Sequence, residues 1–93
     1  MENTGKQYEI FVYGRVQGVG FRYAARNQAR SLGLKGWVKN QPDGSVLTLI
    51  QGDTEACNRY IQWCRNGPGY CWVERIEVKE NPVSPLSHFR IIQ

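Results

Sequence analysis

Residues 8–33 read YEIFVYGRVQGVGFRYAARNQARSLG, and they contain a predicted strand, a glycine-rich loop and a predicted helix in that order. Tyr8 to Tyr13 is rich in aromatic and β-branched residues, which favours a strand. From Phe21 to Leu32 the apolar residues recur at helical spacing, and Gly33 follows where a left-handed C-cap belongs. The stretch therefore predicts a β-loop-α unit whose loop is shaped by glycine.

The rest of the chain predicts a hairpin, a second helix and two more strands. Strands at Gly36–Asn40 and Ser45–Gln51 flank the turn signal Pro42-Asp43-Gly44. A helix at Thr54–Arg65 and strands at Trp72–Val78 and Phe89–Ile92 follow. The order β-α-β-β-α-β plus a short C-terminal strand predicts an α+β fold. It is the ferredoxin-like split βαβ sandwich, with two helices on one face of a mostly antiparallel sheet.

Length and composition limit the chain to one small domain. With 93 residues there is no room for a second core, so we expect disorder at residues 1–7 and a single domain at residues 8–93. No apolar run approaches the ~20 residues of a membrane helix, and the polar N-terminus lacks a signal peptide. We therefore expect a cytoplasmic monomer that has no membrane or nucleic-acid partner.

The cysteines suggest neither a metal nor a disulfide framework. Cys57 and Cys64 share the inner face of the second predicted helix and are expected to be buried. The chain has no Cys-x-x-Cys motif, and its single histidine, His88, is remote in sequence, so we expect no metal site. A disulfide between Cys64 and Cys71 is left open.

Positive charge gathers in the first half of the chain. The net charge is +4, yet no Asp or Glu occurs between Ile10 and Pro42. The cations in that stretch are Arg15, Arg22, Arg26, Arg30, Lys35 and Lys39. Such a field raises the local concentration of anions. Arg15 and Arg22 flank the glycine loop, where we expect a function, and the others fit a solvated face.

The glycine loop suits a phosphate group. Glycine tolerates positive φ, so successive backbone N–H groups can converge on an anion, and the following helix N-terminus adds free N–H groups. Arg22 opposes the helix dipole, a cost that a bound anion would offset. The spacing fails for a dinucleotide loop, because residue 23 is Tyr, and for a nucleoside-triphosphate loop, because residues 19 and 20 are Val and Gly. A flexible turn is the alternative.

Several short motifs resemble the acylphosphatase family, over a span from about Tyr8 to Ile91. They are Gly14-Arg15-Val16-Gln17-Gly18-Val19-Gly20-Phe21-Arg22, Gly36-Trp37-Val38-Lys39-Asn40, Asp43-Gly44-Ser45-Val46, Gly52 and Phe89-Arg90-Ile91. The resemblance implies a hydrolase that cleaves small acyl phosphates to carboxylate and inorganic phosphate without metal or cofactor. It implies that Arg22 binds the phosphate and Asn40 positions the attacking water. The expected phosphate-binding residues are Arg15, Val16, Gln17, Gly18, Val19, Gly20 and Arg22.

Two other functions stay open at this point. An RNA-binding module would fit the basic charge and the outward-facing Phe11 and Tyr13, but the RNA-recognition strand motif is missing from residues 45–50. A domain that binds carbamoyl or acyl phosphate without turnover is the second alternative, since similar domains occur within larger carbamoyl-transfer proteins. The sequence does not identify the physiological acyl phosphate.

Two expectations concern packing. Phe21 and the three tryptophans Trp37, Trp63 and Trp72 are predicted to pack rather than to contact a ligand. Alternation also gives the outer sheet face an apolar group, which the segment Asn81–Ser87 or a partner would cover. Its members are Phe11, Tyr13, Leu47 and Leu49.

Overall fold

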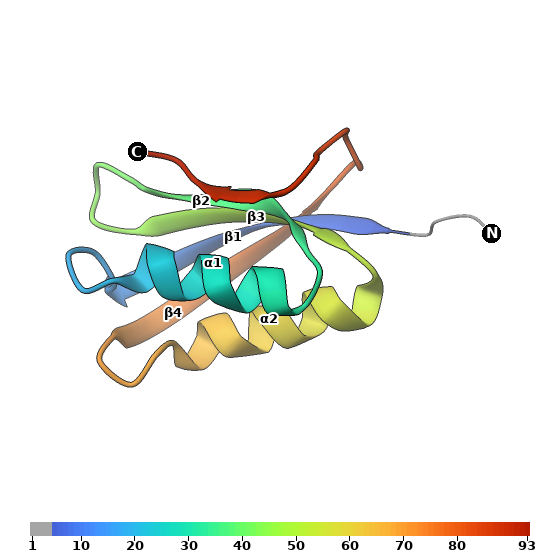
Figure 1. Ribbon diagram of the computed structural model, residues 1–93. Helices are drawn as coiled ribbons and strands as arrows, with labels where there is room; N and C mark the ends of the chain where they lie inside the picture. Colours follow the sequence, from blue (N-terminus) through green and yellow to red (C-terminus); the bar gives the residue numbers. More distant parts are fainter. Residues whose placement is uncertain (1–4) are drawn as a thin grey trace.

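A computed structural model describes residues 5–93 and has five strands and two helices in the predicted order (Figure 1). The elements are β1 (Lys6–Arg15), α1 (Phe21–Ser31), β2 (Lys35–Asn40), β3 (Val46–Gly52), α2 (Thr54–Asn66), β4 (Trp72–Asn81) and β5 (Phe89–Ile91). The sheet order is β4-β1-β3-β2-β5, and only β5 runs parallel to its neighbour, β2. This confirms the ferredoxin-like α+β fold.

Strand β1 starts earlier than the sequence indicates. Residues 1–4 of the segment expected to be disordered lie outside the described residues, but Lys6 and Gln7 are part of β1. Gln7 pairs with Gln51 and Asn81 on its two sides, and its side-chain oxygen accepts a hydrogen bond from the Ser84 N–H at 2.9 Å. The polar residue is only 5% exposed because neighbouring chain segments satisfy it. Strand β1 thus includes two residues of the segment that the sequence places before the domain.

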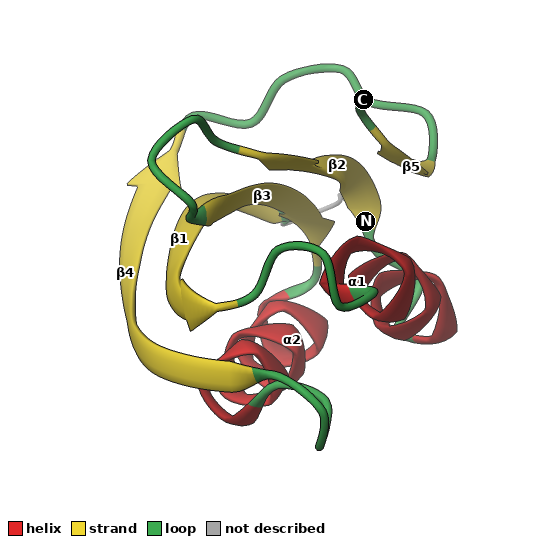
Figure 2. Cartoon of the chain, turned by 90° about the vertical axis from the view of Figure 1, so that its left-hand side faces the viewer, coloured by secondary structure: helices red, strands yellow, loops and turns green. Residues whose placement is uncertain are grey.

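Both helices cover one face of the sheet, and the core lies between the two layers (Figure 2). Alternation along β1 sends Ile10 and Val12 into this core. Phe21 joins them at 1% exposure, as predicted. The inner face of α2 contributes Cys57, Tyr60 and Cys64, which are fully buried. All three cysteines are free thiols. No helix within residues 5–93 is long and apolar enough to cross a membrane.

The chain itself covers much of the outer sheet face. Leu47 and Leu49 are each only 7% exposed. The segment between β4 and β5 crosses this face in Figure 2, and Ser84 within it is hydrogen-bonded to Gln7. At the other end of the face, the Arg75 guanidinium lies 4.0 Å from the centre of the Tyr13 ring. The segment between β4 and β5, which includes the predicted cover Asn81–Ser87, therefore covers part of this face.

Trp72 differs from the expectation that it packs. It is the first residue of β4 and is 63% exposed. The β1–β4 register shifts between Tyr13 and Gly14, and Trp72 pairs with Arg15 beyond that irregularity. Trp63, in contrast, packs against Phe21 with their ring centroids 5.4 Å apart.

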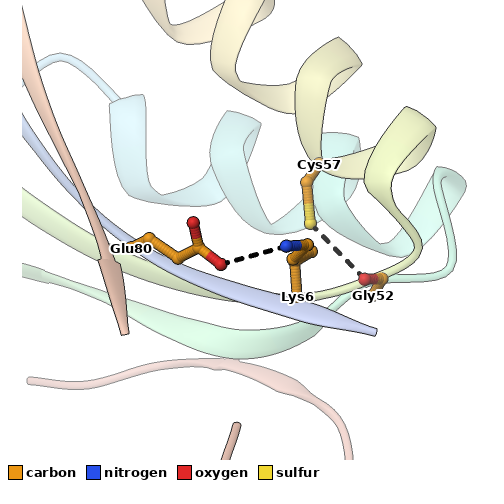
Figure 3. Close-up of polar contacts among 4 residues, drawn as sticks. All are labelled: Lys6, Gly52, Cys57 and Glu80. Atoms are coloured by element: carbon orange, nitrogen blue, oxygen red, sulfur yellow. Dashed lines mark hydrogen bonds and ion pairs between the residues drawn. The ribbon is translucent and has the colours of Figure 1, made fainter. Parts of the chain in front are cut away.

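The two ends of the sandwich carry different groups. At the α2 start, the Cys57 thiol donates to the Gly52 carbonyl at 3.7 Å, and Lys6 forms an ion pair with Glu80 at 3.2 Å (Figure 3). At the opposite end, three loops lie close to one another in Figure 1, those at residues 15–20, 41–45 and 67–71. Most of the expected site residues lie in or next to these loops.

Candidate functional site

A cavity of about 210 Å³ opens where the loop after β1 meets the start of α1 and the end of β2. Its lining residues are Val16, Gly18, Gly20, Phe21, Arg22, Tyr23 and Asn40. Five of the expected site residues are among them, namely Val16, Gly18, Gly20, Arg22 and Asn40. The fold thus brings the loop motif and the β2 motif to one small space.

The loop backbone contains two glycines in the left-handed conformation. Gly18 and Gly20 have φ of 75° and 84°, a left-handed conformation that other residues adopt only at a cost. Residues in this conformation can turn successive N–H groups toward a common point. Val16 is 1% exposed and belongs to the core, although it also lines the cavity.

The start of α1 adds donors to the same cavity. Gly20 is the N-cap and provides no side-chain hydrogen bond, and the first turn contains no acidic residue. The first N–H groups of a helix have no intrahelical partner and carry a partial positive charge. Gly20 and the first three residues of α1 line the cavity, so this uncapped helix start lies at the site.

Arg22 reaches from this first turn toward the C-terminal segment. Its Nη1 donates to the Ile92 carbonyl at 3.4 Å, a long bond that uses one of the five guanidinium N–H donors. The side chain is half-buried and lines the cavity. A guanidinium in this position can bind two oxygens of one anion.

Asn40, the last residue of β2, places an unsatisfied oxygen in the site. Its side-chain Oδ1 is buried and has no hydrogen-bond partner among residues 5–93. A buried acceptor left unpaired costs about 1–3 kcal/mol. The arrangement can therefore accept a hydrogen bond from a water molecule or another donor that enters the cavity.

Gln17 has a role that sequence reasoning missed. Its Nε2 donates to the Gln41 and Ser45 carbonyls, both at 2.8 Å, which ties the glycine loop to the β2–β3 turn. Because both bonds use the side-chain amide nitrogen, the expected phosphate contact from Gln17 can come only from its backbone N–H. No local sequence signal identifies this bond, because the two partners are 24 and 28 residues away.

The β2–β3 turn is itself held by Asp43. Its Oδ1 accepts hydrogen bonds from the Ser45 N–H at 2.9 Å and from the Ser45 hydroxyl at 2.6 Å. These two bonds lower the pKa of the Asp43 carboxyl below its usual value. Because Ser45 also accepts from Gln17, the turn and the glycine loop form one hydrogen-bonded unit.

Three expected site residues do not line the cavity: Gln17, whose bonds are described above, Arg15 and Val19. Arg15 is the exposed last residue of β1, and Val19 is 38% exposed within the loop. Tyr23, which sequence reasoning did not select, lines the cavity, and Arg26 lies 5.3 Å from the centre of its ring. The His88 ring nitrogen Nδ1 is hydrogen-bonded to the Ser87 hydroxyl just before β5. Within residues 5–93 no three His, Cys, Asp or Glu side chains gather as a metal site would require.

Comparisons of the sequence with family models and with curated proteins both match acylphosphatases. The acylphosphatase family model matches residues 8–91. An acylphosphatase from Thermococcus kodakarensis is 46% identical over 81 residues, which cover 87% of this chain and 89% of that protein.

Solved structures agree with the sequence comparison. The crystal structure of acylphosphatase from Bacillus subtilis superposes with a TM-score of 0.91 at 39% identity, covering 95% of this chain and 99% of that one. The crystal structure of HypF from T. kodakarensis is similar over 95% of this chain but only 12% of its own, with a TM-score of 0.82 and 32% identity.

Proposed function

Because the chain belongs to the acylphosphatase family and is an enzyme that hydrolyses acyl phosphates, we propose a mechanism built on its glycine loop, Arg22 and Asn40. In this proposal the loop at residues 15–20 and Arg22 hold the phosphate, and Asn40 orients the attacking water. The observation that carries it is that Arg22, Asn40 and two loop glycines line one cavity of about 210 Å³.

The chemistry of the substrate fits such a simple site. The leaving group is a carboxylate, whose pKa near 4 means that no general acid is needed. The transition state of phosphoryl transfer is loose, with charge spread over three equatorial oxygens. Catalysis then requires positioning and electrostatic stabilisation.

The anion-binding half of the proposal rests on donors. Backbone N–H groups of the loop and of the first α1 turn can surround the phosphate oxygens, and Arg22 adds a delocalised positive charge. Bound phosphate would also offset the unfavourable position of Arg22 at the positive end of the helix dipole.

The water-binding half rests on the unpaired Oδ1 of Asn40. A water that donates to this oxygen would be held beside the phosphate and would satisfy a buried acceptor. None of the lining residues is Asp, Glu, His or Cys. We therefore assign the proton of the water to a substrate phosphate oxygen.

Two substitutions separate these roles. Arg22→Ala is expected to reduce kcat for benzoyl phosphate by about 10²–10³-fold, the effect of losing one transition-state donor, and to weaken inhibition by inorganic phosphate. Asn40→Ala is expected to reduce kcat by a similar factor while inhibition by phosphate is unchanged. Urea unfolding checks that both variants are folded. Equal losses of phosphate binding in the two variants would contradict the division of roles.

Some finer expectations stay predictions. They are that the enzyme needs no metal, acts as a monomer, is cytoplasmic and has no nucleic-acid partner. The chemistry of a carboxylate leaving group supports the first of them. Activity that persists after treatment with EDTA, and a mass of 10.7 kDa by light scattering, would test the first two.

A further inference from the structure

Four exposed apolar side chains lie at the end of the molecule that contains the proposed phosphate site, namely Val19, Tyr23, Tyr70 and Trp72. Six large apolar side chains within residues 5–93 are exposed: Val19, Tyr23, Tyr70, Trp72, Val78 and Val83. Val19 belongs to the glycine loop, Tyr23 lines the cavity, and Trp72 pairs with Arg15 at the start of the loop. Exposed apolar surface at a binding site often serves a ligand.

Tyr70 is the member of this group that lies against the loop. A Cβ atom placed on Gly20 would be 3.8 Å from Cε1 of the Tyr70 ring and 3.9 Å from its hydroxyl oxygen, which is ordinary van der Waals contact. Gly20 itself lines the cavity. Tyr70 itself is 63% exposed, so much of its surface is free to contact a ligand beside the loop.

The sheet order places Tyr70 and Asn40 on opposite sides of the phosphate loop. The loop continues from β1, Asn40 ends β2, and Tyr70 lies in the connection that leads into β4. In the sheet, β4 is on one side of β1, and β3 and β2 are on the other (Figure 2). In phosphoryl transfer the attacking and leaving oxygens are roughly in line. A water held by Asn40 therefore directs the leaving carboxylate toward the β4 side, where Tyr70 lies.

We propose that Tyr70, together with the exposed Val19, binds the acyl group, so that this enzyme prefers aromatic or other apolar acyl phosphates to small polar ones. The inference rests on the proposed phosphate site and adds an acyl subsite to it. Aromatic contacts of this kind contribute about 3- to 10-fold in affinity. Because the contact exists in the ground state and in the transition state, it lowers KM and leaves kcat unchanged.

The test compares Tyr70→Ala with the unmodified enzyme on benzoyl phosphate and acetyl phosphate. We expect kcat/KM for benzoyl phosphate to fall by about 3- to 10-fold through KM, and kcat/KM for acetyl phosphate to stay within about twofold. Tyr70→Phe keeps the ring and is expected to retain the original values. Val83→Ala removes an exposed apolar side chain in the β4–β5 segment and serves as the matched control.

Inhibition by inorganic phosphate separates failure of the subsite from failure of the phosphate site. Phosphate has no acyl group, so its inhibition constant is expected to be unchanged in Tyr70→Ala. Equal losses on both substrates, or no loss on benzoyl phosphate, would overturn the acyl subsite while leaving the phosphate site intact. An unchanged inhibition constant in Arg22→Ala would instead overturn the phosphate site. If Tyr70→Ala does not fold, Tyr70→Gln replaces it in the test. Glutamine also removes the aromatic ring, but its side chain is longer than that of alanine, and the same comparison of substrates applies.

Discussion

The two helices cover the same face of one sheet, yet their N-termini are built in opposite ways. At the start of α2, the Asp53 carboxylate accepts the Ala56 N–H at 2.8 Å, and Glu55 adds a second acid to the first turn. At the start of α1, Gly20 has no capping side chain, and Arg22 occupies the first turn in place of an acid. The chain caps the α2 terminus with its own side chain and leaves the α1 terminus without a side-chain cap.

The difference has a cost in stability. A capping side chain contributes about 1 kcal/mol, and an acid near a helix N-terminus adds a few tenths more. Both contributions are present at α2 and absent at α1. The proposed phosphate site therefore lies at the helix start that folding alone leaves less stable, and substitutions at the two starts should separate activity from stability.

The largest effect is expected from a substitution that places an acid at the α1 start, as the α2 start already has. Gly20→Asp would put a carboxylate where we expect the phosphate, and two like charges about 5 Å apart repel by about 3 kcal/mol at an effective dielectric of 20. We predict a fall in kcat/KM of at least about 10²-fold. Gly20→Asn has the same size and the same backbone strain without the charge. Losses of equal size in the two variants would show that strain rather than charge is responsible.

Loosening the loop that precedes α1 should have an intermediate effect. Gln17→Ala removes both 2.8 Å bonds to the β2–β3 turn, so the loop and Asn40 lose their fixed relation. We predict that kcat falls by about tenfold and that the free energy of unfolding in urea falls by about 1–2 kcal/mol. Exposed Gln62 on α2 provides the control Gln62→Ala. Unchanged kcat in Gln17→Ala would remove the positioning role.

Removing the cap of α2 should reduce stability alone. We predict that Asp53→Ala lowers the free energy of unfolding by about 1 kcal/mol, because the Ala56 N–H loses its partner. The kinetic constants should not change, since Asp53 lies at the end of the molecule away from the cavity. Asp53→Asn, which can still accept the bond, is expected to lose less. A fall in kcat for Asp53→Ala would mean that the two helix starts are coupled.

The smallest expected effect is a change of stability with pH that comes from ionisation of the Cys57 thiol near the α2 start. Burial, together with the nearby Asp53 carboxylate, raises the pKa of the Cys57 thiol to about 11. The folded chain thus holds this proton at a pH where the unfolded chain has lost it, so stability is fully present below about pH 9 and decreases as pH rises toward 11. Between pH 8 and pH 9.5 the loss should be less than about 1 kcal/mol. In urea unfolding, the free energy of unfolding of Cys57→Ala should not show this decrease with pH. An identical pH dependence in the variant and the unmodified protein would exclude Cys57 as its source.

The elements that the sequence predicts well are those set by neighbouring residues. The glycine loop, the helix that follows it and the hairpin turn at Pro42-Asp43-Gly44 all depend on local φ preferences and periodicity, and the structure has them. The side of the sheet facing the helices also follows from alternation along β1. For the same reason, the loop at residues 14–22 could be selected before its position in space was known, whereas Asn40 was selected through the resemblance to the acylphosphatase family.

The features that the sequence did not predict depend on pairing between distant strands. Gln17 finds its two carbonyl partners only after the hairpin packs beside the loop. Tyr70 reaches Gly20 because the α2–β4 connection returns to the same end of the sheet. Trp72 is exposed because the β1–β4 register shifts next to it. None of these outcomes has a signature within a few residues.

The β1–β4 pairing has a consequence for synthesis of the chain. Gln7 pairs with Asn81, so β1, which is synthesised first, cannot pair with β4 until most of the chain has been synthesised. At about 5–20 residues per second, residues 8–81 take roughly 4–15 s to translate. Once β1 has left the ribosome and before β4 follows, the β1 edge that will pair with β4 is open to pairing with another polypeptide. Such distant strand pairing also makes refolding slow compared with a helical bundle of this size.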